Sequence, residues 1–130
     1  SLETIVTDLN KHNIKVPKII ILGQGKLKQT LQKKIIDLGY EDNVKILMTN
    51  KPWEYLSVSK IFLSLQKKTN YPSKAIIESM YCECIPIISD TVDSKYLVPE
   101  NYPYFINKNF KPKELSKKLI EILKLNEKPN

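Results

Sequence analysis

The sequence predicts an α/β fold, a Rossmann-like three-layer sandwich with a mostly parallel sheet of about five strands. Short apolar runs alternate with amphipathic stretches about five times along the 130 residues. The apolar runs are continuous, as in strands that are buried on both faces of a parallel sheet. Parallel strands need crossover connections, so this alternation places helices on both faces of the sheet. Without an internal repeat or a linker, residues 1–130 are predicted to form one domain.

The first half of the chain contains two predicted helices and two predicted strands. Apolar residues at helical spacing predict a helix over residues 2–12, and residues 18–22, KIIIL, form the first apolar run. A second helix follows and ends at Gly39, a residue that is common just after helices. Residues 43–48 are the second predicted strand. The apolar positions of the second helix are Leu27, Leu31, Ile35 and Leu38.

The middle of the chain contains a short helical turn, a strand and a longer helix. Pro52 opens the turn, which extends to Leu56, and residues 61–65 form the third predicted strand. The polar residues 66–72 form a loop. Ser73 is a suitable N-cap for a helix that extends to about Cys82.

The last third of the chain contains two predicted strands and a final helix. Residues 85–89 form the fourth strand, and after a long irregular connection residues 104–107 form a short fifth strand. Pro112 suits the first turn of the last helix, where its missing N–H carries no penalty. The residues of this helix that are predicted to face inward are Leu115, Leu119, Ile122 and Leu123.

The cysteine content and the hydropathy exclude several classes of protein. Cys82 and Cys84 are the only cysteines, too close for a comfortable disulfide and without the partners of a zinc site. No apolar run approaches the ~20 residues that span a bilayer. We therefore expect a protein of a reducing, cytoplasmic compartment without a metal ion.

The charge is strongly basic, with a formal net charge of +7, and all 21 basic residues are lysines. Proteins that recognise bases and phosphates specifically depend on the fork of arginine. The lysines are scattered, accompanied by 14 acidic residues and by no aromatic stacking platform. A solvated surface is therefore the favoured interpretation and a nucleic-acid partner is not expected. A weak attraction to an anionic membrane surface or a phosphorylated ligand stays open.

Two of the three glycines, Gly23 and Gly25, directly follow the first predicted strand. A dinucleotide-binding fingerprint would need a third glycine where Lys28 stands, and a P-loop would need Gly-Lys followed by Ser or Thr. Neither motif is present. A tight turn and a close approach by another molecule or domain both stay open.

Residues 70–90, NYPSKAIIESMYCECIPIISD, carry the most specific pattern. The segment resembles the donor-binding, C-terminal domain of GT-B glycosyltransferases of the large retaining, glycogen-synthase-like group. That family continues from a glutamate as E-A-M-A-C-G-x-P into a buried strand. The matching residues are Glu78, Ser79, Met80, Cys82 and Pro86. Together with ILGQGKLKQTL upstream, the resemblance covers residues 19–98 in the order of the family.

The resemblance implies a set of donor-binding residues. Glu78 corresponds to the family's second glutamate, which accepts hydrogen bonds from the ribose hydroxyls of a nucleotide sugar. The start of its helix carries partial positive charge that can receive the diphosphate. The implied donor-binding residues are Gly23, Gly25, Met48, Thr49, Ser73, Lys74, Ala75 and Glu78. The alternative, that Glu78 only pairs with Lys74 on an exposed helix face, stays open.

The sequence departs from the family at two positions of this segment. Asn70 replaces the first glutamate, which the family uses to contact hydroxyls of the transferred sugar; Asn70 and Glu78 are the residues implied at the catalytic centre. Glu83 replaces the glycine that usually follows the helix. Because asparagine carries no charge, a non-catalytic interaction module with a decayed site is the alternative interpretation.

The resemblance implies transfer of a hexose from a nucleotide-diphosphate sugar to a glycan or lipid-linked acceptor, in bacterial polysaccharide or lipopolysaccharide synthesis, with retention and without a metal or other cofactor. The chain begins within the first helix of the domain and has no arginine. We therefore expect a fragment that lacks the first strand and the N-terminal acceptor domain and is inactive alone. A cytoplasmic location is expected, with a peripheral position at the inner face of the membrane as an open alternative.

Overall fold

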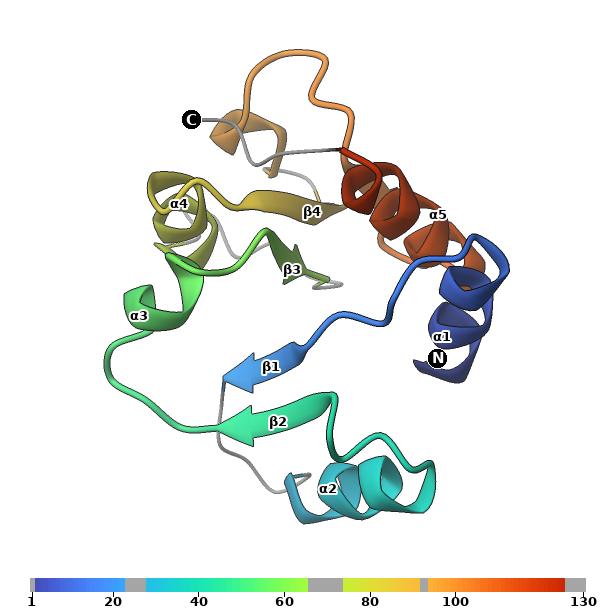
Figure 1. Ribbon diagram of the computed structural model, residues 1–130. Helices are drawn as coiled ribbons and strands as arrows, with labels where there is room; N and C mark the ends of the chain where they lie inside the picture. Colours follow the sequence, from blue (N-terminus) through green and yellow to red (C-terminus); the bar gives the residue numbers. More distant parts are fainter. Residues whose placement is uncertain (1, 23–27, 66–73, 92–93, 126–130) are drawn as a thin grey trace. The chain divides into compact units, whose positions relative to one another are not determined.

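The computed structural model describes residues 2–22, 28–65, 74–91 and 94–125 (Figure 1). The chain is divided into two compact units. One comprises Lys15–Pro52, and the other comprises Ser1–Ile14 with Trp53–Asn130. The prediction that residues 1–130 form one domain stays a prediction.

The unit Lys15–Pro52 contains two parallel strands and one helix. Its elements are β1 (Ile19–Leu22), α2 (Lys28–Asp37) and β2 (Val44–Leu47). The strands pair in parallel, with Ile19 opposite Val44 and Leu22 opposite Leu47. Ile35 is the buried residue of α2.

Helix α2 ends in a Schellman motif that confirms the role predicted for Gly39. Gly39 has φ +77°, the left-handed conformation that only glycine adopts without a steric cost. The Tyr40 N–H donates to the Ile35 carbonyl at 3.0 Å, and the Gly39 N–H donates to the Ile36 carbonyl at 2.9 Å.

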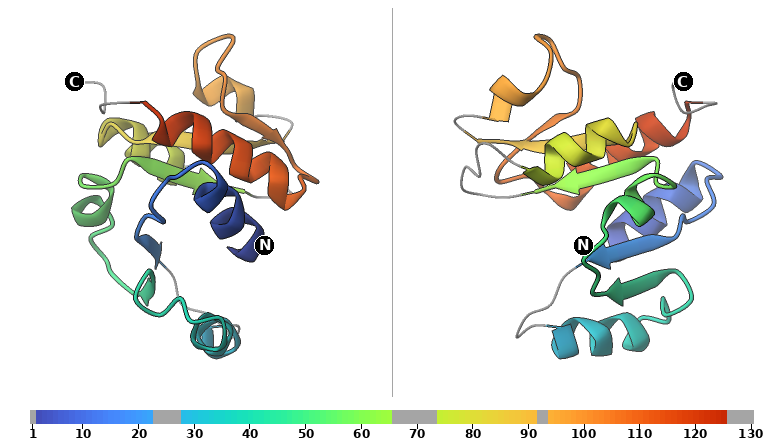
Figure 2. Two further views of the ribbon diagram at one scale, coloured as in Figure 1. Left: turned by 45° about the vertical axis from the view of Figure 1, so that its right-hand side comes forward. Right: turned by 90° about the vertical axis from the view of Figure 1, so that its left-hand side faces the viewer.

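The larger unit is built around a three-stranded parallel sheet in the order β3-β4-β5. Helices α1 and α5 lie side by side against it in all three views (Figures 1 and 2). The elements of this unit are α1 (Leu2–Lys11), α3 (Trp53–Leu56), β3 (Ile61–Ser64), α4 (Lys74–Tyr81), β4 (Ile85–Asp90), the 3₁₀ helix η1 (Ser94–Leu97), β5 (Phe105–Asn107) and α5 (Pro112–Leu123).

Strand β4 is the centre of the larger unit and is buried on both faces. Ile87 packs against Ile106 of β5 and against Leu115 and Ile122 of α5. Because side chains alternate along a strand, Ile88, which is 1% exposed, points to the opposite face. Helix α4 covers that face. The unit therefore has the predicted three layers, with helices on both sides of its sheet.

The predicted elements are confirmed, with boundaries shifted by one or two residues. The five predicted strands are present and all their pairings are parallel, although the structure groups them into a two-stranded and a three-stranded sheet. In α5, Leu115 and Ile122 are buried as predicted, while Leu119 and Leu123 are only partly buried. Ile120 of α5 is also buried, which was not predicted from the sequence.

A proline interrupts the hydrogen-bonding edge of β4 on the side of β5. Ile88 donates its N–H to the Tyr104 carbonyl at 3.0 Å, so Pro86, two residues earlier, faces the same side without an N–H. The Tyr102 hydroxyl donates to the Pro86 carbonyl at 2.5 Å. Burial raises the pKa of Tyr102 well above its ordinary value, and Tyr104 raises it further. The phenol therefore stays protonated and able to donate.

Helix α4 ends in the same motif as α2, but with a residue that is poorly suited to it. Glu83 occupies the left-handed position with φ +64°. The Cys84 N–H donates to the Ser79 carbonyl at 2.9 Å, and the Glu83 N–H donates to the Met80 carbonyl at 3.0 Å. In an L-residue this conformation costs ~1–2 kcal/mol because Cβ crowds the following carbonyl.

Replacement of Glu83 by glycine is expected to raise the free energy of unfolding by about 1 kcal/mol, since glycine removes the crowding but increases the entropy of the unfolded chain. Urea denaturation monitored by circular dichroism measures the change. Glu83→Ala is the matched control, because alanine removes the charge and keeps Cβ. An equal gain from alanine would show that the charge, and not the backbone conformation, destabilises the wild type.

Candidate functional site

Helix α4 brings its first turn to the carboxyl edge of the β3-β4-β5 sheet. The Ile85 N–H donates to the Lys60 carbonyl at 2.8 Å, so the residues that follow α4 lie at the amino ends of β3 and β4. The helix therefore runs antiparallel to these strands, and Lys74 and Ala75 lie at the opposite edge. Ligands of open parallel α/β sheets bind at this edge.

One face of α4 is fixed by burial and leaves another face accessible. Ile76 is 3% exposed and Ser79 is fully buried. The Ser79 hydroxyl donates to the Ile76 carbonyl at 2.7 Å, so its polar atom is satisfied within the helix. With this face held against the sheet, Lys74, Ala75 and Glu78 keep access to solvent.

Glu78 forms a long ion pair with Lys74, one helical turn earlier. The Lys74 Nζ and Glu78 Oε1 atoms are 3.7 Å apart, and the side chains are 90% and 32% exposed. An exposed pair of this kind is worth only tenths of a kcal/mol, and lysine before glutamate is the weaker order. The ion pair of the alternative interpretation, in which Glu78 only pairs with Lys74, is thus formed in the structure. The pair is weak enough for both groups to exchange it for a ligand.

Met48 and Thr49 follow β2 and belong to the unit Lys15–Pro52. The side chain of Met48 is 70% exposed. The Lys51 N–H donates to Thr49 Oγ1 at 3.0 Å, and this bond turns the chain directly after the strand. The loop thus holds Thr49 and presents an apolar side chain, Met48, to solvent.

The structure therefore brings together Lys74, Ala75 and Glu78 on one helix. Gly23, Gly25, Asn70 and Ser73 lie outside the described residues. The assignment of all these residues to a donor site stays a prediction.

The two cysteines of the C-x-C pair have no metal partners in the part of the chain that the structure describes. There, no group of three His, Cys, Asp or Glu side chains is arranged to hold a metal ion. Cys84 is buried, and its thiol donates to the Leu56 carbonyl at 3.0 Å. This contact joins the residue just before β4 to α3 and gives Cys84 a structural role.

Across the described ranges, none of the helices combines the length and the apolar character that crossing a bilayer requires.

A groove of about 320 Å³ lies along α1 and α5, away from α4. It is lined by Asp8, His12, Lys113, Lys117, Ile120, Glu121 and Lys124. In the sequence alone these lysines are part of the scattered surface charge. Their spacing along one helix could have indicated a shared basic face. The groove itself could not be predicted, because Asp8 and His12 reach it only through the packing of α1 on α5.

The glycosyl transferases group 1 family model matches residues 4–130. A solved structure, that of TarM, superimposes with a TM-score of 0.74 at 22% identity and covers 93% of this chain and 24% of TarM. This likeness confirms the predicted fold.

Two curated relatives are also similar. A glycosyltransferase of Methanocaldococcus jannaschii, described as uncharacterized, is 33% identical over an alignment of 123 residues, and the match covers 86% of this chain and 30% of the relative. N-acetylgalactosamine-N,N'-diacetylbacillosaminyl-diphospho-undecaprenol 4-alpha-N-acetylgalactosaminyltransferase of Campylobacter jejuni is 32% identical over 74 residues, 56% of this chain and 20% of the relative. The chain thus spans less than a third of the length of either relative.

Proposed function

The chain belongs to the glycosyl transferases group 1 family, and from this premise we propose that it is the donor-binding half of a glycosyltransferase. The complete enzyme would transfer a hexose from a nucleotide-diphosphate sugar to a glycan or a lipid-linked acceptor. The acceptor class is supported by the name of the Campylobacter relative, which acts on a diphospho-undecaprenol substrate. The acceptor would be bound by a domain outside this chain, so the chain alone would bind the donor and transfer nothing.

The observation that carries the proposal is the placement of Glu78. Its side chain is 32% exposed and its carboxylate pairs only weakly with Lys74. Glu78 is on the helix whose first turn is at the carboxyl edge of the sheet. An ionised carboxylate accepts several hydrogen bonds and donates none. It can therefore accept from both vicinal hydroxyls of a ribose, in accordance with the role of the corresponding glutamate in the resembled family.

Lys74 and Ala75 supply the second part of the proposed site. The first-turn N–H groups of a helix carry partial positive charge and have no partner within the helix. The diphosphate would bind there, and the Lys74 ammonium would leave Glu78 to contact it. Positive charge at this position stabilises the leaving nucleoside diphosphate as negative charge develops on it. No metal ion is needed for this role.

Titration of the ¹⁵N-labelled chain with UDP- and GDP-hexoses at millimolar concentrations tests the proposal. We expect saturable shifts of the amide resonances of Lys74, Ala75 and Glu78. Titration with the free nucleoside is the control, because it carries the ribose but not the diphosphate. It should shift Glu78 and leave the amides of Lys74 and Ala75 nearly unchanged. If no sugar nucleotide shifts these resonances, the proposed site is wrong.

A second candidate is a non-catalytic interaction module of the same fold. Asn70, in place of the charged residue of the family, favours it. The two candidates differ in the complete parent protein. An assay of sugar transfer by that protein decides between them, since an active parent eliminates the module.

A further inference from the structure

The groove along α1 and α5 lies on the other side of the sheet from α4. Leu115 and Ile122 of α5 pack on the face of β4 that presents Ile87, whereas α4 covers the face that presents Ile88. The two helices that form the groove lie side by side (Figure 2). The groove is therefore separate from the proposed donor site, and its charges need another explanation.

Two lysines of α5 and the lysine that caps its carboxyl end line the groove, and none of the three forms an ion pair among the described residues. Lys113, Lys117 and Lys124 are all exposed. Their spacing of four and then seven residues places them along one side of the helix. Lys113 and Lys117 repel each other at this spacing, so the isolated helix gains nothing from the arrangement. At 1.5 Å per residue the Cα atoms of the three lysines span about 16 Å along the helix axis.

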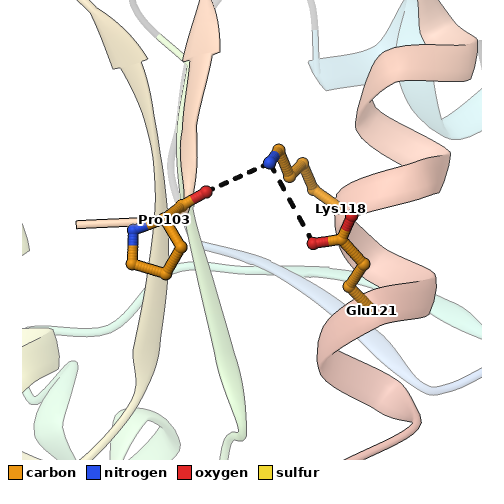
Figure 3. A network of polar contacts seen from close by, with 3 residues as sticks. All are labelled: Pro103, Lys118 and Glu121. Atoms are coloured by element: carbon orange, nitrogen blue, oxygen red, sulfur yellow. Dashed lines mark hydrogen bonds and ion pairs between the residues drawn. The ribbon is translucent and has the colours of Figure 1, made fainter. Parts of the chain in front are cut away.

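Two carboxylates line the same groove, and one of them is already neutralised. This is Glu121, whose Oε2 atom lies 4.0 Å from Lys118 Nζ. The same ammonium group donates to the Pro103 carbonyl at 3.1 Å (Figure 3). Asp8 is the other carboxylate. His12 is oriented by its Nδ1–H, which donates to the Asp8 carbonyl at 2.9 Å. The groove therefore keeps an excess of positive charge.

We propose that this groove docks on an anionic membrane surface, with Lys113, Lys117 and Lys124 facing the phosphate groups of acidic phospholipids. Three lysines whose Cα atoms span about 16 Å along a helix are spaced for several anionic groups and not for a single phosphate, and a lipid surface offers many such groups. Lysine acts as a hydrated point charge and not as a bidentate fork, which suits diffuse attraction to a surface. The inference rests on the proposed function in one respect: a lipid-linked acceptor would lie in such a membrane.

Cosedimentation with vesicles tests the inference. The chain should bind vesicles that contain phosphatidylglycerol and not vesicles of pure phosphatidylcholine. A triple variant, Lys113→Gln, Lys117→Gln and Lys124→Gln, should bind about a hundredfold more weakly, or about fivefold per lysine. The matched control replaces Lys28, Lys33 and Lys34 of α2 by glutamine, with the same change in net charge. An equal loss in both variants, or no binding by the wild type, would overturn the proposal.

A charge change of opposite sign provides a second test. Asp8→Asn removes a carboxylate from the groove and should tighten vesicle binding about fivefold, while circular dichroism confirms that each variant is folded. Inorganic phosphate is the competing ligand. If it binds saturably in the groove and vesicles do not, the site is for a free phosphate and the membrane proposal is wrong.

The donor titration keeps the two proposals separate. The lysine variant should retain the shifts of Lys74, Ala75 and Glu78 on addition of sugar nucleotides. Loss of vesicle binding with intact donor shifts supports a separate membrane surface. Absence of donor shifts in the wild type would contradict the proposed function, whatever the vesicles show.

Discussion

Replacement of Glu78 by glutamine should weaken the binding of a UDP- or GDP-sugar about ten- to a hundredfold. Hydrogen bonds to an ionised group contribute ~1.5–3 kcal/mol, and glutamine has nearly the same size without the charge. Its amide nitrogen also cannot accept a hydrogen bond, so one of the two ribose hydroxyls loses its partner. Isothermal titration calorimetry or the amide shifts of Lys74 and Ala75 measure the change in affinity.

The free energy of unfolding should change little in the same variant. The pair that Glu78 forms with Lys74 is exposed and 3.7 Å long, so its loss should cost less than ~0.5 kcal/mol. Glu83→Gln is the matched control, because it removes the same charge from an exposed residue beyond the other end of α4. Unchanged donor affinity in Glu78→Gln, or an equal loss in the control, would show that Glu78 is only a surface residue.

The largest effect on stability is expected for Ile87. This side chain is fully buried at the centre of β4 and packs against Ile106, Leu115 and Ile122. Ile87→Ala leaves a cavity that the rigid β-layer can fill only in part. It should lower the free energy of unfolding by about 2–5 kcal/mol, a large fraction of the ~5–15 kcal/mol that is typical of domains.

Urea denaturation measures this loss. Val58→Ala is the control, because Val58 is 84% exposed and its truncation should stay within ~0.5 kcal/mol. A loss below ~1 kcal/mol for Ile87→Ala would show that the packing of α5 on β4 contributes much less than its burial indicates.

The fold was predictable where local sequence and burial agree. The continuous apolar run at 85–89 predicted a strand that is covered on both faces, and Ile87 and Ile88 confirm it. Gly39 and Pro112 marked a helix end and a helix start through their backbone preferences alone. Glu83 was less predictable, because its left-handed conformation opposes the preference of its residue type.

Within the candidate site, only the arrangement of residues on the single helix α4 was predictable from the sequence. The four-residue spacing of Lys74 and Glu78 predicted that they could meet, and they form an ion pair. The groove was not predicted because Asp8 and Lys113 are more than a hundred residues apart in sequence and share a cavity only through the packing of α1 on α5. The bond between Tyr102 and Pro86 likewise depends on how an irregular loop returns to the sheet.

The proline in β4 determines how much of the following chain can join the sheet. Strand β5 has only three residues, Phe105–Asn107, and the Tyr104 carbonyl just before them accepts the N–H of Ile88. If β5 slid two residues toward the amino end of β4, that carbonyl would meet Pro86 and find no donor. The proline thus disfavours this alternative alignment of the two strands. The chain before Phe105 therefore leaves the edge of β4. There the Tyr102 hydroxyl, and not a backbone N–H, donates to the Pro86 carbonyl.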